Sequence, residues 1–445
     1  MNRTTIVGVV LALLPSVAAE AADLAIRNGD VMVFLGDAIT EEYQGRGAAD
    51  RVSYPTHVES FLTVRYPNVR VTYYNVAWSK VSAAADTLGR LERDVLPLKP
   101  TVAVLCFGMQ DGALGPVNEA VLNAHKAAMT ALVKRLKDAG CRVYVLSPPS
   151  IDAPTTATTA ADRNDSLAAY AEAQKAIAAA HGAEFVDWFT ASKEARAKAV
   201  VRNPNFYFTR DGIHHTTRSL ALAATLLLKA FRAEPIDVRI TLDWKENVLE
   251  CNVDGARLTV GEDGRRTVYV PNVPLPWPTF MGRMEGLGSD WEAAEWCRYL
   301  LTIRNSPPAL MLAQEAGARQ VPMMAVQLTE GYNLALLEPL RSLEAAVDLA
   351  NLIRRKNYTR VHCWRDQELE PVKEKELVDA QKALIEAWNK YFVGYGERIA
   401  NSPKSFDLVF DVSAIPTMPP PTAPAATRPL PMVTPAASTA PAQEP

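Results

Sequence analysis

The first half of the chain alternates between short apolar runs and longer amphipathic segments. Runs that are apolar throughout, or at every second position, are typical of β-strands, and apolar residues spaced three and four apart are typical of helices. The pattern predicts strands at 31–35, 69–74, 101–107, 142–146 and 184–187, and helices at 54–64, 87–95, 117–139, 162–180 and 218–231. Strands that alternate with helices form βαβ units, in which helices cover both faces of a parallel sheet. We therefore predict one α/β domain over residues 23–235.

The pattern changes after residue 235. Residues 236–270 alternate apolar and polar positions, and Asp254-Gly255 and Asp263-Gly264 are turn signals, so we expect hairpins and a β-rich module over 236–330. Helical spacing is found at 291–305, 342–356 and 372–401, and we predict a helical extension over 331–413. Residues 414–445 are rich in Pro, Ala and Thr. Such a composition cannot bury a core, so this segment is expected to be a disordered tail.

The N-terminus has the pattern of a secretory signal peptide. Arg3 is followed by an apolar run at 6–14, then by Pro15 and a run of small residues that ends at Ala22. The apolar run is well short of the ~20 residues that a bilayer span needs, so cleavage of residues 1–22 and export to the periplasm or the medium are predicted. No later segment is apolar enough to predict a transmembrane helix. The net charge of -3 argues against nucleic acid or an anionic membrane as a main partner.

The five cysteines are widely spaced and form no CxxC or Cys/His cluster. This spacing predicts neither a metal site nor a cofactor held by cysteines, and we expect none. Cys106 and Cys141 lie in or beside apolar strands, where cysteine usually acts as a small hydrophobic residue. A disulfide among Cys251, Cys297 and Cys363 is left open by the sequence.

Polar residues gather where the predicted strands end. The carboxyl ends of the strands in an open parallel sheet are where such folds bind their ligands. Four short blocks stand at these ends or before the last helix of the domain: Gly36-Asp37-Ala38, Asn75-Val-Ala77-Trp-Ser-Lys80, Gly108-Met-Gln110-Asp111 and Asp211-Gly-Ile-His214. We therefore expect the four blocks to share one site.

In this order the four blocks resemble those of the SGNH/GDSL hydrolases, a family of esterases and acylhydrolases. The resemblance implies a three-layer, flavodoxin-like α/β fold. In the family a Ser attacks an ester carbonyl, a His takes its proton, and an Asp three residues earlier orients that His. The resemblance therefore assigns a catalytic pair to Asp211 and His214, and oxyanion-hole positions to Ala38, Ala77 and Gln110.

The resemblance extends beyond the first domain. Gly331-Tyr-Asn-Leu-Ala335 and Trp364-Arg365 look like motifs of a secreted subgroup of the family that carries a C-terminal extension. The likeness covers most of residues 25–370. It implies a small-molecule ester or an acylated carbohydrate as the ligand, and it names no protein partner.

The chain departs from the family at the positions that carry the chemistry. Ala38 stands where the family has its nucleophilic Ser, and a methyl group cannot be activated by any base, so the acyl-enzyme route is closed there. Ala77 stands where the family has Gly, and pays a steric penalty if its φ is positive. Gln110 replaces an Asn and is one methylene longer, which alters the reach of its amide. Lys80 adds bulk and charge beside the site, and catalysis is expected to be impaired.

Other polar residues near the four blocks can be explained without a catalytic role. Asp37 is adjacent to the site and is interpreted as a cap of the following helix. His215 is interpreted as a neighbour of His214 and not as a second base. Ser79 or Thr40 would replace the missing nucleophile only if hydrogen-bond reach to His214 existed, and turn hydroxyls are usually bonded locally.

Three of the tryptophans in the C-terminal half, at positions 277, 291 and 296, are candidates for a binding site. Aromatic side chains of this kind either line a carbohydrate site or fill the core of a small module. Burial is the commoner situation, because a large apolar ring gains most when it is removed from water.

Three functions remain open from the sequence. In the first, the protein is a pseudoenzyme whose cleft still binds an acyl ester or an acylated glycan. In the second, Asp211 and His214 activate water directly, and the protein is an ester hydrolase. In the third, the hydrolase scaffold has decayed and the protein has a structural or partner-binding role.

Overall fold

The computed structural model describes residues 23–41, 52–78, 83–112, 115–152, 157–212, 214–277, 295–313, 320–336, 348–349, 351–357 and 406–411, and isolated positions between 376 and 391. The predicted signal peptide at 1–22 and the predicted tail at 414–445 lie outside these residues. So do Ser79, Lys80, Trp291 and Cys363, together with most of the helix predicted at 372–401.

A five-stranded parallel sheet forms the centre of the N-terminal domain, with the strand order β2-β1-β3-β4-β5. The strands are β1 (Asp30–Gly36), β2 (Val71–Asn75), β3 (Val102–Cys106), β4 (Arg142–Leu146) and β5 (Glu184–Val186). The predicted α/β class with a parallel sheet is confirmed. The order changes direction at β1, which lies between β2 and β3, and ligands of such sheets bind outside the carboxyl ends of the strands at this switch point.

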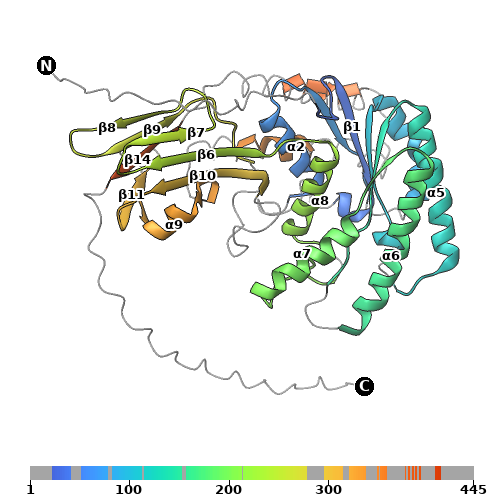
Figure 1. The fold of residues 1–445 in the computed structure, drawn as a ribbon. Coiled ribbons are helices and arrows are strands. Elements are labelled where there is room, and N and C mark those ends of the chain that lie inside the picture. The colour runs from blue at the N-terminus through green and yellow to red at the C-terminus, as the bar shows by residue number, and fades with distance from the viewer. Residues whose placement is uncertain are drawn as a thin grey trace, which may run out of the picture.

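Helices cover both faces of this sheet, as Figure 1 shows. The helices of the domain are α1 (Ala38–Glu41), α2 (Tyr54–Arg65), α3 (Ala83–Arg90), α4 (Met109–Gly112), α5 (Glu119–Asp138), α6 (Ala157–Ala180), α7 (Trp188–Arg202) and α8 (Thr217–Ala230), with short turns η1 (Leu91–Val95) and η2 (Leu96–Leu98) after α3. Alternate residues of β1 enter separate cores. Met32 and Phe34 pack with the core that holds α2 and α8, whereas Val33 and Leu35 pack with the core of α3 and α5.

The longest helix of the domain that was not predicted from the pattern is α7. Its N-cap is Asp187, whose side chain accepts a hydrogen bond from Thr190 N–H (2.9 Å). The sequence pattern includes Asp187 in the preceding strand, but the residue ends β5 and starts the helix. The buried face of the helix includes Ser192 and Ala195, whose side chains are polar or small, so its apolar stripe is weak and periodicity did not indicate a helix.

Two further sheets form the C-terminal region, with strand orders β13-β10-β6-β7 and β12-β11-β14-β9-β8. Their strands are β6 (Ile236–Asp243), β7 (Val248–Cys251), β8 (Arg257–Val260), β9 (Arg266–Val270), β10 (Cys297–Arg304), β11 (Ala309–Ala313), β12 (Val321–Met324), β13 (Tyr332–Asn333) and β14 (Phe406–Asp411), accompanied by α9 (Ala325–Glu330) and the turn η4 (Leu334–Leu336). The antiparallel pairing predicted within 236–270 is confirmed by β6 with β7 and by β8 with β9.

Two segments predicted to be helical contain strands. Residues 291–305 contain β10, which pairs in parallel with β6 along its whole length. The side chains of β10 alternate between buried and partly exposed, which is the period of a strand, and the neighbouring β6 stabilises it. Residues 331–413 contain β14, which lies between β9 and β11. The second sheet therefore extends across the boundary drawn at residue 330. Residues 351–357, within the predicted helix 342–356, are helical.

The C-terminal region packs against α2. Trp277 is fully buried, and its indole N–H lies 3.0 Å from His57 O and 3.2 Å from Ser60 Oγ. Its ring meets Phe61 edge to face, with centroids 5.1 Å apart, and Trp296 also meets Phe61 edge to face, with centroids 5.5 Å apart. Trp277 therefore fills the junction between the two regions, and burial is the correct interpretation for it.

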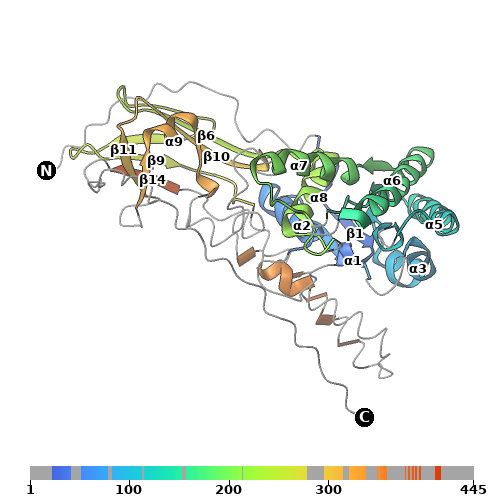
Figure 2. The same ribbon diagram turned by 90° about the horizontal axis from the view of Figure 1, so that it is seen from below.

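A buried ion pair forms a second contact with α2. The ammonium of Lys356 is bonded to the carboxylate of Glu59, and both side chains are almost completely buried. Leu349 and Ile353 of the same segment are also buried, and Figure 2 shows the short helix of residues 351–357 near α2. The pKa of Glu59 is raised because burial outweighs the opposing effect of Lys356. The segment at 348–357 is thus part of the folded body.

Among the residues described by the structure, no helix combines the length and the apolar character that a bilayer span requires. Cys106, Cys141 and Cys251 are free thiols. Cys297 Sγ accepts a hydrogen bond from Trp277 N–H (3.2 Å), so Cys251 and Cys297 are not joined. Cys363 lies outside the described residues.

Candidate active site

The loops that follow β1 and β3 meet at the carboxyl edge of the parallel sheet. The two strands pair in register, with Gly36 opposite Cys106, so their loops start side by side. Asp37 Oδ2 accepts a hydrogen bond from Gln110 N–H (3.1 Å), and Asp37 Oδ1 accepts one from Ile39 N–H (3.2 Å). The second bond caps the start of α1, as predicted for Asp37. The first bond joins α1 to α4.

Gly36 is required by the tight turn after β1. A Cβ at this position would lie 2.6 Å from Cys106 O and would overlap the side chain of Thr40. Thr40 itself is completely buried, and its hydroxyl is 3.0 Å from Tyr54 OH. A hydroxyl that is buried and bonded in this way is poorly placed to act as a nucleophile.

Asp37 has an unusually high pKa for a carboxyl group. Its side chain is only 2% exposed, and removal from water raises the pKa from 3.8 to about 6. The backbone N–H groups of Gln110 and Ile39 oppose this rise, and the nearby negative charge of Asp111 adds to it. Because burial is the largest of these effects, Asp37 changes its charge between pH 5 and pH 7.

Asp37→Asn is expected to alter the pH dependence of stability. The folded chain holds a proton on Asp37 between pH 3.8 and about 6, where the unfolded chain has released it, so Asp37 makes stability fall as the pH rises through this range. At pH 7 the charged form costs about 3 kcal/mol by linkage. The amide removes that cost and leaves one backbone N–H without an acceptor, at about 1 kcal/mol.

The variant should therefore be about 2 kcal/mol more stable than the natural chain at pH 7 and slightly less stable at pH 4. Urea unfolding at both pH values measures this difference. Asp138→Asn, on an exposed position of α5, is the matched control and should leave stability unchanged. An equal effect of Asp37→Asn at both pH values would contradict the assignment of the high pKa to Asp37.

A buried chain of hydrogen bonds holds the loop after β3. Gln174 Nε2 donates to Phe107 O (2.9 Å) and to His125 Nε2 (3.0 Å). Because that ring nitrogen accepts, the proton of His125 lies on Nδ1, which donates to Asp111 Oδ2 (3.1 Å). His125 and Gln174 are buried at 2% and 0% exposure. This pair of Asp and His therefore fixes α4, which carries Gln110, and has no free nitrogen to act as a base.

Ala77 has another partner for its backbone N–H. That N–H donates to Asn75 Oδ1 (3.1 Å), and Asn75 Nδ2 in turn donates to Thr40 O (2.7 Å). Ala77 does not belong to the described residues that have a positive φ, so the steric penalty considered for it does not arise. A ligand oxygen would have to share this N–H with Asn75, which weakens it as an oxyanion donor.

Ala38 and Gln110 stand at neighbouring positions of the site, and both are half-buried. Ala38 is the first residue of α1, and Gln110 follows the first residue of α4. The hydrogen bond from Gln110 N–H to Asp37, next to Ala38, keeps the two helix starts together. The structure therefore brings together Ala38 and Gln110, two of the residues to which the resemblance assigned oxyanion-hole positions. Lys80 lies outside the described residues.

Asp211 and His214 form a hydrogen-bonded pair in the turn before α8. Asp211 Oδ2 lies 2.6 Å from His214 Nδ1, and Asp211 Oδ1 accepts a hydrogen bond from His214 N–H (2.8 Å). Gly212 between them has a φ of +81°, which glycine adopts without strain. The side chains of Asp211 and His214 are 55% and 56% exposed, so water reaches the imidazole.

The direction of α8 places this pair on the same edge of the sheet. Phe231, directly after α8, accepts a hydrogen bond at its carbonyl from Ala25 N–H (2.8 Å), shortly before β1 begins. The end of α8 is therefore at the amino edge. An α-helix of this length spans ~21 Å, close to the ~23 Å of β1, so the start of α8 lies at the carboxyl edge.

Two residues next to this turn were given no role by the sequence. Asp152, six residues beyond β4, accepts hydrogen bonds from Phe208 N–H and Thr209 N–H. Its position after a predicted strand end was a signal, but the contact joins segments that are distant in sequence. His215 was interpreted as a neighbour of His214, and it is completely buried beside the exposed pair.

Comparison with known proteins gives one family and several similar folds. Residues 34–218 match the model of the GDSL-like Lipase/Acylhydrolase family. Among the curated proteins, none is similar enough in sequence to match. The solved structure of BT4096, a gut microbial diltiazem-metabolizing enzyme, has a similar fold with a TM-score of 0.65 and 18% identity, over 86% of this chain and 98% of the other.

Two smaller structures match about half of this chain. A catalytic mutant of Axe2, an acetylxylan esterase from Geobacillus stearothermophilus, has 22% identity and a TM-score of 0.39, over 47% of this chain and 97% of the other. LAE5, an alpha/beta hydrolase enzyme from the metagenome of Lake Arreo, Spain, has 20% identity and a TM-score of 0.38, over 47% of this chain and 98% of the other. The fold shared with BT4096 includes much of the C-terminal region as well.

Proposed function

Because residues 34–218 form a GDSL-like lipase/acylhydrolase domain, as the four blocks predicted, we propose that the protein binds an acyl ester or an acylated glycan without forming an acyl-enzyme. The observation that carries the proposal is Ala38, which occupies the nucleophile position within an otherwise ordered set of polar contacts. A methyl group has no lone pair to attack a carbonyl carbon, so the covalent route is closed. The surrounding groups still offer hydrogen bonds to an ester.

The binding groups are those that remain at the carboxyl edge of the sheet. Ala38 keeps its backbone N–H, and Gln110 keeps an amide donor held by the bond from its backbone to Asp37. His214 is oriented by Asp211 through Nδ1, which leaves Nε2 to meet the ligand. The N–H of Ala38 and the amide of Gln110 are donors that suit the carbonyl oxygen of a neutral ligand, whereas His214 Nε2 is an acceptor that suits a glycan hydroxyl or a water molecule. The family match supports an ester as the class of ligand.

A second function is favoured by the exposure of the Asp211–His214 pair. The imidazole is more than half exposed and is bonded to a carboxylate at 2.6 Å. Such a pair can accept a proton from water while the water oxygen attacks the ester carbonyl, and the alcohol then leaves with a proton. This route needs no nucleophile at Ala38. By this route the protein would be a slow ester hydrolase instead of a binding protein.

The N-terminal sequence supports a further part of the proposal. Residues 1–22 have the basic, apolar and small-residue order of a signal peptide. We place the protein outside the cytoplasm on this basis. An acylated glycan is a ligand that an exported protein meets there.

Calorimetry with acetylated xylo-oligosaccharides and short-chain aryl acetates tests the proposed function, together with mass spectrometry of the recovered ligand. We expect saturable binding and intact ligand. His214→Ala and Gln110→Ala should each weaken binding by about tenfold, the effect of one lost hydrogen bond of ~1.4 kcal/mol. His181→Ala, at the end of α6 and the amino edge of the sheet, is the matched control and should bind normally.

Two other outcomes of this experiment would contradict the binding function. If the natural chain releases acetate and His214→Ala does not, the binding function is wrong and the protein is a hydrolase that activates water. Absence of both binding and hydrolysis with folded protein would reject ester recognition and favour a structural role for the scaffold.

A further inference from the structure

Asp211 and His214 lie on a short loop whose two ends are joined to each other by backbone hydrogen bonds. Thr209 and His215 form an isolated antiparallel bridge, and Arg210 N–H donates to His214 O (2.9 Å). Just outside the bridge, Thr216 N–H donates to Phe208 O (2.6 Å). The loop from residue 209 to residue 215 therefore has a fixed base, and Asp211 and His214 lie beyond it.

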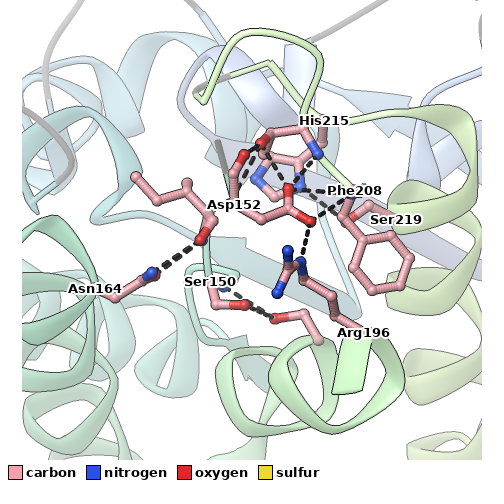
Figure 3. Close-up of polar contacts among 10 residues, drawn as sticks. Ser150, Asp152, Asn164, Arg196, Phe208, His215 and Ser219 are labelled. Carbon is pink, nitrogen blue, oxygen red and sulfur yellow. Dashed lines mark hydrogen bonds and ion pairs between the residues drawn. The ribbon is translucent and has the colours of Figure 1, made fainter. Parts of the chain in front are cut away.

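Asp152 holds the first end of this loop. Its carboxylate is buried at 6% exposure and accepts hydrogen bonds from Phe208 N–H (2.8 Å), Thr209 N–H (2.7 Å) and the Thr209 hydroxyl (2.7 Å). Arg196 Nε of α7 donates to the same carboxylate from the other side (2.8 Å; Figure 3). Hydrogen bonds to an ionised carboxylate are about twice as strong as neutral ones. Asp152 thus ties the loop to the segment after β4, at the carboxyl edge of the sheet.

His215 holds the second end. It is completely buried, its ring lies against Trp188 with centroids 5.5 Å apart, and its Nδ1 is 2.8 Å from Ser219 Oγ, one turn into α8. Burial lowers the pKa of His215 to about 3, so the ring is neutral above that pH. The charged groups that face it are Asp152, Asp211 and His214. A neutral, buried imidazole next to the exposed His214 anchors the backbone and takes no part in proton transfer with solvent.

We propose that Asp152 and His215 are positioning residues: they clamp the two ends of the 209–215 loop, and the clamp sets where His214 meets a ligand. The proposal rests on the proposed function, because the placement of His214 matters only if His214 contacts the ester. Figure 3 shows Asp152, Arg196, His215 and Ser219 around the base of the loop. A displacement of about 1 Å in a reacting group typically lowers the rate about 10²-fold. Loss of the clamp would therefore lower the rate strongly even if the loop moved little.

The test uses the full chain with two conservative variants, Asp152→Asn and Ser219→Ala. Asp152→Asn keeps the shape of the side chain but removes its charge and one of its two accepting oxygens. Ser219→Ala removes the partner of His215 without the cavity that His215→Ala would leave beside Trp188. Ser192→Ala is the matched control. It breaks the bond between Ser192 and Ser150, which joins the segment after β4 to α7 without contact to the loop.

Two measurements separate the clamp from the proposed function. The first is the set of ¹⁵N resonances of the His214 ring in the natural chain, which report whether Nδ1 keeps its proton and whether the ring has one position. The second is the hydrolysis of an aryl acetate by chains that also carry Ala38→Ser. We expect Asp152→Asn and Ser219→Ala to lose the single set of His214 resonances and to lower kcat by about 10–100-fold, with KM changed less than twofold.

Ser192→Ala should leave the His214 resonances and kcat unchanged. The proposal is overturned if Asp152→Asn and Ser219→Ala leave the His214 resonances unchanged, or if Ser192→Ala alters them equally. If the Ala38→Ser chain has no activity, the resonances alone decide. Their loss in the two clamp variants then supports the clamp, while the function proposed for His214 fails.

Discussion

Ala38→Ser is expected to hydrolyse short-chain aryl acetates about 10²–10⁴ times faster than the natural chain. A serine at the start of α1 restores the nucleophile, and Asp211 and His214 are already bonded to each other as a general base requires. A complete triad is worth about 10⁶-fold in the best-studied serine proteases. The gain here is smaller because Gln110 is longer than the family's Asn, and Ala77 N–H is bonded to Asn75.

The initial rate of aryl acetate hydrolysis measures this effect. Ala38→Ser combined with His214→Ala should return the rate to that of the natural chain, because the hydroxyl then has no base. Ala38→Gly changes the same position without adding a hydroxyl and should not gain activity. A folded Ala38→Ser chain with no activity would mean that His214 does not reach the residue at position 38, and the site assignment would then be wrong.

Trp277→Ala is expected to lower the free energy of unfolding by about 3–5 kcal/mol. The side chain is fully buried between the C-terminal region and α2, and its ring packs edge to face with His57 and Phe61. Its truncation leaves a cavity at this junction and removes the hydrogen bonds of the indole N–H to His57 O and Ser60 Oγ. Urea unfolding followed by circular dichroism measures the loss.

Trp277→Phe separates packing from hydrogen bonding at this junction. It keeps an aromatic ring and removes the N–H, so we expect a smaller loss of about 1–2 kcal/mol. A second transition in Trp277→Ala would show that the two regions then unfold separately. A loss below about 1 kcal/mol in Trp277→Ala would mean that other contacts, such as the Glu59–Lys356 pair, hold the junction without it.

The site was predictable from sequence only where the chemistry is local. Asp211 and His214 lie three residues apart, so a single turn is enough to let their side chains meet. Asp37 and Gln110 are 73 residues apart, and their contact follows from β1 and β3 being neighbours in a parallel sheet. The family resemblance gave their order along the chain. It gave no indication that Ala77 N–H is bonded to Asn75 or that burial raises the pKa of Asp37.

The amino-acid pattern by itself determined the α/β class, the five strands of the first domain and their order along the chain, the hairpins after residue 235 and the family of residues 34–218. These features depend on short-range periodicity and on residues near strand ends, which the sequence contains directly. Tertiary structure decided the rest. The segment of β10 became a strand because β6 lies beside it, and β14 joined a sheet whose other strands precede it by many residues. Asp152, His125 and Trp277 gained their roles only from partners far away in the chain, since burial and hydrogen bonding depend on how distant segments pack.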